Sequence, residues 1–262
     1  MIYEQNLSQL KYSEHDIYEK ICDPDFCWDE SRSIVEYARN EEPILVYIRE
    51  DGRKEYLNSR YNPTKEAEKF MEDSVDLPEK ATLVLIGFGN GTHIREFISK
   101  SKNEDTNCIV YEPCKDLFMR ILHDIDITDI LKDERVHIVV NGINNKKAGV
   151  YSEIYISSVN RKSNKHIALP KYRNLFPEAC DDFLHILKNT YEDIEVERNT
   201  IRVYGERAAY NGIQNLCYLP GCYSSIGYIG KFPKNLPGIV VAAGPSLEKN
   251  VDMLKKAKGR AL

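Results

Sequence analysis

Three glycines follow a short apolar run in "LVLIGFGNGTHIREF", at Gly87, Gly89 and Gly91. Glycine permits a tight turn and a close approach of the backbone to a ligand, and a helix that begins near Thr92 would point free N–H groups toward that ligand. About twenty residues later a second apolar run, "NCIVYEP", ends in Glu112, whose carboxylate could accept hydrogen bonds from ribose hydroxyls. The spacing predicts a nucleotide-type site formed by Gly87, Gly89, Gly91 and Glu112.

These residues allow two interpretations. The arrangement resembles the first motif and the acidic strand end of S-adenosylmethionine-dependent methyltransferases over roughly residues 81–142, and S-adenosylmethionine would then be the cofactor. The sequence departs from that pattern at Ile86, where many such enzymes carry an acid nearby, and at Asn141, which ends the third apolar run. In the second interpretation the glycine turn serves packing alone, in a sheet that has lost its ligand.

A second turn stands near the end of the sequence, in "GIVVAAGPSLEKN". The apolar run predicts a buried strand at residues 239–242, Gly244 and Pro245 predict a stiff turn, and Ser246 is suited to cap a helix over residues 247–257. A phosphate or sugar oxygen above this turn would meet free N–H groups at the positive end of the helix dipole. The pattern predicts a nucleotide-binding turn at Gly244, Pro245, Ser246 and Leu247.

The segment "GIVVAAGPSLEKNVDMLKKAKGRAL" resembles the start of the central domain of the motility accessory factor (Maf) family, a domain related to archaeal 6-hydroxymethylpterin diphosphokinase-like (MptE-like) proteins. Its Gly-Pro-Ser-Leu turn is also similar to the nucleotide-sugar loop of bacterial sialyltransferases. Two earlier segments, "LNSRYNPTKEAEKF" and "NGIQNLCYLPGCYSSIGYIGKFPKNLPG", are similar to the family's N-terminal domain and to the region that leads into its catalytic domain. The resemblance covers most of the chain, and its sharp motif is the turn that begins at Gly244.

This resemblance implies a function. Family members are cytoplasmic transferases that attach nonulosonic acids, such as pseudaminic or legionaminic acid, to serine or threonine of flagellin. The donor would be a CMP-activated sugar, and flagellin or its chaperone would be the partner. The chain would be the front part of such an enzyme, inactive by itself, with its catalytic residues beyond Leu262.

Three alternatives to this glycosyltransferase stay open. A pterin diphosphokinase could use the turn at Gly244 for a phosphate-rich substrate. A methyltransferase could use the turn at Gly87. A module without enzymatic activity could dock flagellin or its chaperone and deliver it to a transferase domain.

Composition limits the partners. The 262 residues are 42% hydrophobic, which is enough for one large core or two ordinary ones. The sequence shows neither a long apolar run typical of a membrane span nor the start of a signal peptide, which favours the cytoplasm. With 36 basic and 41 acidic side chains well mixed and a net charge of -5, we expect no nucleic acid or membrane as partner.

Seven cysteines without a secretion signal favour reduced thiols over disulfides. Two pairs share a spacing, Cys22 with Cys27 and Cys217 with Cys222, and four thiolates brought together could hold zinc. Four intervening residues are the loose end of zinc-ligand spacing, and neither pair carries the usual Gly or Pro knuckle. We therefore expect no metal site.

Local patterns predict the elements that would position these residues. Asp51-Gly52 between two β-rich runs predicts a hairpin of residues 44–48 and 54–58. Asn62 and Pro63 predict the start of a helix over residues 63–73. The remaining β–α alternation predicts strands at 83–86, 108–111 and 136–140 and helices at 114–123 and 127–132.

The second half is helical in pattern. We expect a helix at residues 150–159, and beyond Pro177 two long helices or one that breaks near Gly205. The Gly- and Pro-rich residues 220–238 predict a domain boundary. The expected fold is α/β: an N-terminal hairpin and helix region (1–75), a Rossmann-like, methyltransferase-like parallel sheet with a helical end (76–232), and the first β–α unit of a truncated MptE-like transferase domain (236–262).

Overall fold

The computed structural model describes residues 1–74, 80–101, 104–157, 159–160, 162–221, 224–228, 230–231, 238–242 and 244–257. The chain forms two compact units, Met1–Thr200 and Ile201–Leu262. The sequence had instead predicted divisions after residues 75 and 232, whereas here the N-terminal hairpin and the following β–α alternation belong to one unit. The site predicted at Gly87 lies in the first unit, and the site predicted at Gly244 lies in the second.

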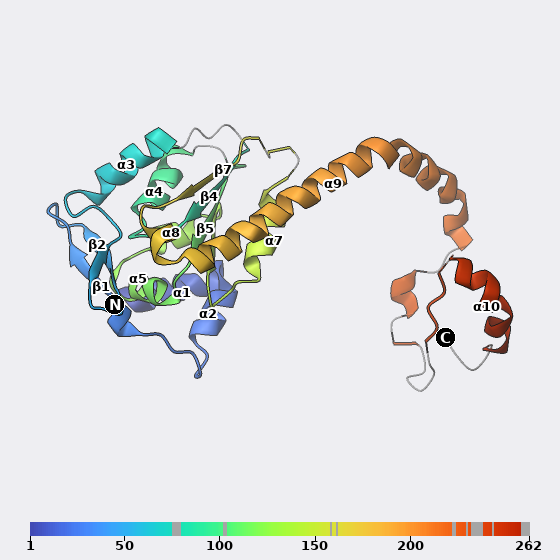
Figure 1. The fold of residues 1–262 in the computed structure, drawn as a ribbon, viewed down its shortest axis with the longest axis horizontal. Helices are drawn as coiled ribbons and strands as arrows, with labels where there is room; N and C mark the ends of the chain where they lie inside the picture. Colours follow the sequence, from blue (N-terminus) through green and yellow to red (C-terminus); the bar gives the residue numbers. More distant parts are fainter. Residues whose placement is uncertain are drawn as a thin grey trace. The chain divides into compact units, whose positions relative to one another are not determined.

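A four-stranded parallel sheet forms the centre of the first unit (Figure 1). Its strands are β4 (Thr82–Ile86), β5 (Asn107–Glu112), β6 (Val136–Val140) and β7 (Lys165–Ala168), in the order β6-β5-β4-β7. The three strands predicted at residues 83–86, 108–111 and 136–140 are confirmed as β4, β5 and β6. They were predictable because almost all of their residues are buried, which gives each strand an apolar run in the sequence. Strand β7, "KHIA", was not predicted, since this edge strand is half exposed and carries no apolar run.

Helices cover both faces of this sheet. On one face, alternate strand residues such as Leu85 and Val110 pack against α4 (Thr92–Lys100) and α5 (Lys115–Asp124). On the other face, Val84 and Ile109 pack against α7 (Lys147–Tyr155) and the first part of α9 (Pro177–Asn215). The sheet is therefore buried from both sides, which is the architecture expected of an α/β fold.

The front of the chain forms a second, antiparallel sheet in the order β1-β2-β3. It contains β1 (Ser33–Tyr37), β2 (Pro43–Ile48) and β3 (Lys54–Tyr56). The predicted hairpin is confirmed: Val46 pairs with Tyr56, and Gly52 in the turn has a φ of 80°, which favours glycine. Strand β1 was not predicted.

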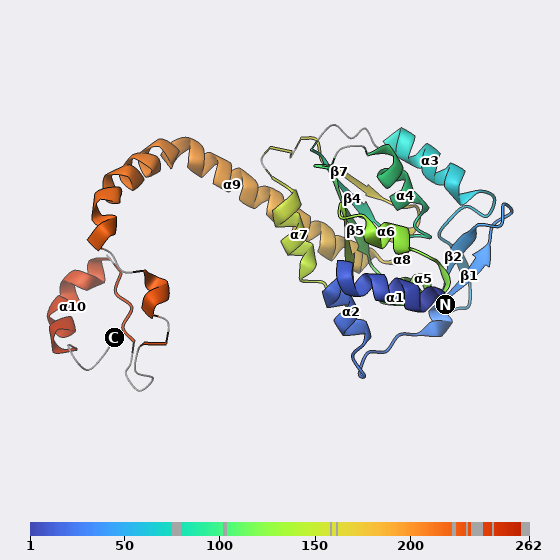
Figure 2. The ribbon, with the colours of Figure 1, turned by 180° about the vertical axis from the view of Figure 1, so that it is seen from behind.

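The first unit also contains the helices α1 (Ile2–Ser13), α2 (His15–Ile21), α3 (Pro63–Ser74) and α6 (Thr128–Lys132) (Figure 2). The predictions of α3, α5 and α6 are confirmed, and Asn62 caps α3 by accepting a hydrogen bond from the amide of Lys65 at 2.8 Å. Helix α1 is held by the buried Asn6, whose Nδ2 donates to the carbonyls of Leu122 and Ile125 at 2.9 and 2.7 Å.

Two predicted helices differ in the structure. Helix α7 begins and ends earlier than the predicted residues 150–159. Helix α9 runs unbroken through Gly205, because a single glycine lowers helix stability by only about 1 kcal/mol and does not end a helix by itself. The short helix α8 (Tyr172–Leu175) precedes α9.

The second unit contains the short 3₁₀ helices η2 (Leu216–Gly221) and η3 (Ser225–Tyr228) and the helix α10 (Pro245–Lys256). The strand predicted at residues 239–242 does not form: these residues pair with no strand, and Val240 is 98% exposed. A β-strand requires a neighbour for its N–H and C=O groups, and the described part of this unit offers none. No helix among the described residues is long and apolar enough to cross a membrane.

Candidate functional site

The glycine turn connects β4 to α4 and has the backbone that its sequence predicts. Gly87, Gly89 and Gly91 have φ angles of 101°, 58° and 86°, in the left-handed region that residues with a Cβ rarely adopt. Gly91 is the N-cap of α4. All of residues 87–91 are buried.

The structure brings Glu112 to this turn, as the sequence predicts. Its side chain is fully buried; one carboxylate oxygen accepts a hydrogen bond from the amide of Phe88 at 3.0 Å, and the other accepts from the amide of Cys114 at 3.0 Å. Burial raises the pKa of Glu112 to about 7, although both amides oppose this rise. The carboxylate therefore binds the protein's own backbone.

Tyr172, the first residue of α8, fills the space beside the turn. Its hydroxyl accepts a hydrogen bond from the amide of Gly89 at 2.9 Å and interacts with the nearby carboxylate of Glu112. Its ring lies so close to Gly87 that a Cβ there would be 2.7 Å from it. Burial raises the pKa of Tyr172 well above its ordinary value, so the hydroxyl keeps its proton.

Two buried asparagines attach the antiparallel sheet to the turn. Asn58 donates to Asn90 Oδ1 at 3.0 Å, and Asn90 donates to the carbonyl of Pro43 at 2.8 Å. The same Asn58 accepts a hydrogen bond from the amide of Leu45 at 3.3 Å. The sheet formed by β1, β2 and β3 is thus fixed to the carboxyl end of β4.

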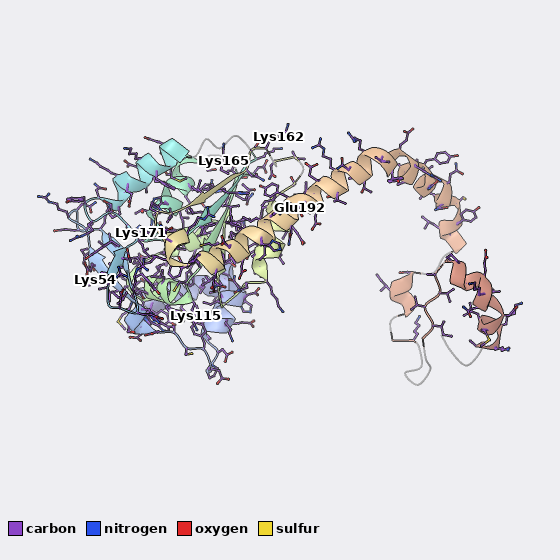
Figure 3. All side chains as sticks on the ribbon, in the orientation of Figure 1. Lys54, Lys115, Lys162, Lys165, Lys171 and Glu192 are labelled. Carbon is purple, nitrogen blue, oxygen red and sulfur yellow. The ribbon has the colours of Figure 1, made fainter. Side chains whose placement is uncertain are left out.

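Charged residues hold the rim of this region. Lys171, labelled in Figure 3, precedes Tyr172 and pairs with Glu55 of β3 at 3.4 Å, and Arg49, which directly follows β2, pairs with the same carboxylate at 2.8 Å. Lys115, also labelled, donates to the carbonyl of Cys27 at 2.8 Å. Residues from the first sixty positions of the chain therefore form ion pairs or hydrogen bonds with the residue before α8 and with the first residue of α5.

In this arrangement the turn and Glu112 do not fit a nucleotide. The amides of Phe88 and Gly89 already donate to Glu112 and Tyr172, and the amide of Gly91 donates to the carbonyl of Phe88 at 3.1 Å. A ribose beside Glu112 would have to displace the Tyr172 ring. The geometry favours the interpretation in which the glycine turn serves packing over one in which it binds S-adenosylmethionine.

The second predicted turn has a simpler geometry. Gly244, with φ −116° and ψ 168°, is the N-cap of α10, and Pro245 occupies the first helical position. The helix thus begins two residues earlier than predicted, and Ser246 lies inside its first turn instead of capping it, because the fixed φ of proline suits the first helical position. The amide of Leu247 donates to the carbonyl of Gly244 at 2.9 Å.

Three of the four cysteines of the two equally spaced pairs lie among the described residues. Cys22, Cys27 and Cys217 are free and exposed, and Cys222 lies outside the described residues. Within the described ranges, no group of three or more His, Cys, Asp or Glu side chains is placed to hold a metal ion.

Sequence reasoning missed Tyr172, Asn58 and Asn90. Tyr172 lies sixty positions from Glu112, in a stretch without a recognisable motif, so nothing local marks the pair. For Asn90 there was a signal: an amide side chain between two glycines of a turn suits hydrogen bonding to nearby backbone, and Asn90 Oδ1 does accept from the amide of Thr92 at 3.3 Å.

The fold and this region define an α/β protein with a Rossmann-like parallel sheet, in which the crevice at the carboxyl ends of the strands is filled by the chain's own tyrosine. No known protein family matches the sequence, and no curated protein does. Among solved structures, the chain is similar to the Maf glycosyltransferase from Magnetospirillum magneticum AMB-1, with 13% sequence identity and a TM-score of 0.47. That alignment covers 100% of this chain, which spans 45% of the other chain's length.

Proposed function

We propose that this chain is the front part of a Maf-type glycosyltransferase that acts in the cytoplasm. The enzyme would transfer a nonulosonic acid of the pseudaminic or legionaminic type from a CMP-activated donor to a serine or threonine hydroxyl of flagellin, with release of CMP. The observation that carries the proposal is the Gly244-Pro245-Ser246-Leu247 turn, which opens helix α10 directly after an apolar run.

The turn suits a nucleotide for physical reasons. The start of a helix of twelve residues offers N–H groups and the positive end of the helix dipole to an anion. Pro245 holds the first helical position, and Gly244 before it leaves room for a phosphate or sugar oxygen to approach the backbone. Catalytic residues would come from sequence beyond Leu262, as the resemblance implies.

The first unit has another role in this proposal. Because Tyr172 and Glu112 fill the crevice of the parallel sheet, Met1–Thr200 would bind no nucleotide and would instead dock flagellin or its chaperone. The absence of a nucleotide-binding role for the first unit is supported by the burial of the glycine turn and by the antiparallel sheet that is hydrogen-bonded to it.

The test is a calorimetric titration with CMP, S-adenosylmethionine and ATP, on this chain and on a form that continues beyond Leu262. We expect the longer form to bind CMP. The Gly244→Val variant, which places a branched side chain over the helix start, should bind CMP at least about tenfold more weakly. Gly212→Val is the matched control, since a Cβ at position 212 meets no atom within 4 Å.

The other outcomes identify the alternatives. Preferential binding of ATP at the same turn would support a pterin diphosphokinase-like activity in place of glycosyl transfer. Binding of S-adenosylmethionine by the present chain would mean that Tyr172 leaves the crevice, and would overturn the structural role of the glycine turn.

A further inference from the structure

A pocket lies at the β6 edge of the parallel sheet, next to the first residues of this strand. Its volume is about 440 Å³, and its walls come from the end of α1, the loop after α6, the start of β6 and helix α7. The residues that matter for its chemistry are Glu14, His137, Tyr151 and Tyr155. None of them belongs to the glycine turn or to the turn at Gly244.

Glu14 is a buried carboxylate without a cation. It is 5% exposed, and its two oxygens accept hydrogen bonds from the amide of Ile138 at 2.8 Å and from the hydroxyl of Tyr151 at 2.7 Å. Lys147, the nearby ammonium group, pairs with Asp16 at 3.0 Å. Within the described residues, no lysine or arginine forms an ion pair with Glu14, and above its raised pKa of about 7 its charge is stabilised by these two hydrogen bonds and by the more distant Lys147.

His137 offers a hydrogen-bond acceptor on the same wall. The amide group of Asn107 donates to the carbonyl of Asp105 at 3.3 Å, which turns its oxygen toward His137 Nε2 at 3.1 Å. The ring proton must therefore lie on Nε2, and burial lowers the pKa of His137 to about 4, so the ring is neutral. His137 is 8% exposed, and among the described residues its Nδ1 lone pair has no partner.

Aromatic rings and further carboxylates surround these two groups. Tyr155 stacks on His137 with ring centres 3.9 Å apart, and Tyr151 lies at 5.2 Å from the same ring. The lining contains three carboxylates against one ammonium group: Glu14, Asp133, Glu134 and Lys132. Arg135 neutralises Asp133 at 2.6 Å, which leaves two acids and one base.

We propose that this pocket binds a small organic ammonium ion, whose N–H groups donate to Glu14 and to Nδ1 of His137 while its carbon atoms lie against the rings of Tyr151 and Tyr155. Acceptors, aromatic faces and a carboxylate without a counter-ion are the features that recognise such a cation. A metal ion is disfavoured, since no metal-ligand cluster occurs in the described parts of the chain.

The probe is benzylammonium, and benzyl alcohol is its neutral analogue of nearly the same shape. Both are titrated into the full chain at a pH above the Glu14 pKa of about 7, so that its carboxylate is ionised, and binding is followed by calorimetry and by the NMR signals of the His137 and Tyr151 side chains. We expect benzylammonium to bind at least about tenfold more tightly than the alcohol and to shift both signals. Equal binding of the two probes, absence of binding at millimolar concentration, or shifts confined to other residues would each overturn the proposal.

Two variants distinguish the contribution of the buried Glu14 to benzylammonium affinity from that of the surface charge around the pocket. Glu14→Gln keeps an acceptor for Ile138 and a partner for Tyr151 but removes the charge, so benzylammonium affinity should fall about tenfold. Glu134→Gln removes an exposed carboxylate at the same pocket and should change affinity by less than about threefold. Equal effects of the two would refute the role of Glu14.

Tyr155→Leu serves as a second variant in case Glu14→Gln unfolds. It keeps an apolar wall without the aromatic ring and should weaken benzylammonium about threefold or more while leaving benzyl alcohol nearly unchanged. Unchanged benzylammonium affinity in this variant would contradict the aromatic contribution and with it the proposed binding mode.

Discussion

At the scale of single residues, the hydroxyl of Tyr172 interacts with the Glu112 carboxylate at an acidic strand end, where a ribose hydroxyl would donate its hydrogen bond. Tyr172→Phe would leave the buried amide of Gly89 without its acceptor and would remove the hydroxyl that interacts with Glu112. We expect the free energy of unfolding to fall by about 1–3 kcal/mol in urea denaturation.

The control for this change is Tyr12→Phe, since Tyr12 is 80% exposed. It should alter stability by less than about 0.5 kcal/mol. If both variants behaved alike, the Tyr172 hydroxyl would have no structural role.

Glu14 gives a prediction on pH. Burial raises its pKa to about 7, whereas in the unfolded chain a glutamate titrates near 4.3. Between these values the folded state retains a proton that the unfolded state has lost, so raising the pH reduces the free energy of unfolding. The Glu14→Gln variant has no carboxyl group at this position and should not show this fall in the free energy of unfolding. The difference in free energy of unfolding, variant minus unchanged chain, should therefore rise by roughly 1 kcal/mol per pH unit from pH 5 to pH 7.

The measurement is urea unfolding of both proteins at several pH values. Glu112 has a similarly raised pKa but is present in both chains, so its effect cancels in the difference. A difference that stays constant across this pH range would show that Glu14 titrates normally.

At the scale of elements, the sequence predicted the strands, turns and helix caps that are determined by residues close together in the chain. The strands β4, β5 and β6 are continuous apolar runs, and the hairpin turn at Gly52 and the cap at Asn62 each depend on a few neighbouring residues. These features could therefore be predicted without a structure.

Features that depend on residues distant in the sequence could not be predicted from the sequence alone. Strand β7 is a strand because β4 lies beside it, with Leu85 paired to Ile167. The approach of Glu112 to the glycine turn was predictable from strand order, but the tyrosine that fills the crevice was not. A single sequence also gives no sign that the carboxylate of Glu14 would be buried against β6, 124 positions away.

Two glycines with positive φ, Gly52 in the hairpin turn and Gly87 in the glycine turn, provide a test at this scale. Gly52→Ala meets no atom within 4 Å, so it should cost only the backbone strain, about 1 kcal/mol. Gly87→Ala adds a collision with the buried Tyr172 ring and should cost roughly 3 kcal/mol or more. Thermal and urea unfolding of the two variants would measure this contrast, and similar losses would argue against tight packing at the turn.

At the scale of the whole molecule, the division after Thr200 predicts that the first unit is stable by itself. The part of α9 that packs on the sheet, from Cys180 to Ile194, lies inside it. A chain ending at Thr200 should unfold within about 4 °C of the full chain, which corresponds to roughly 1 kcal/mol.

A chain ending at residue 182 is the control. It loses Phe183, whose ring stacks on Tyr111 at 4.1 Å, together with Leu187 and Ile194. We expect it to unfold more than about 10 °C lower, because several buried side chains are removed at once. Comparable melting temperatures for the two shortened chains would place the stabilising part of α9 elsewhere.

The pairing of β4 with β7 has a consequence for synthesis on the ribosome. Residues 82–86 emerge long before residues 165–168, so during translation this central strand, which is wholly buried in the finished fold, has a neighbour on the β5 side alone. Until β7 arrives, its other edge presents unpaired N–H and C=O groups of the kind that recruit strands from other chains. The nascent chain would therefore depend most on chaperones in the interval between completion of β5 and release of β7.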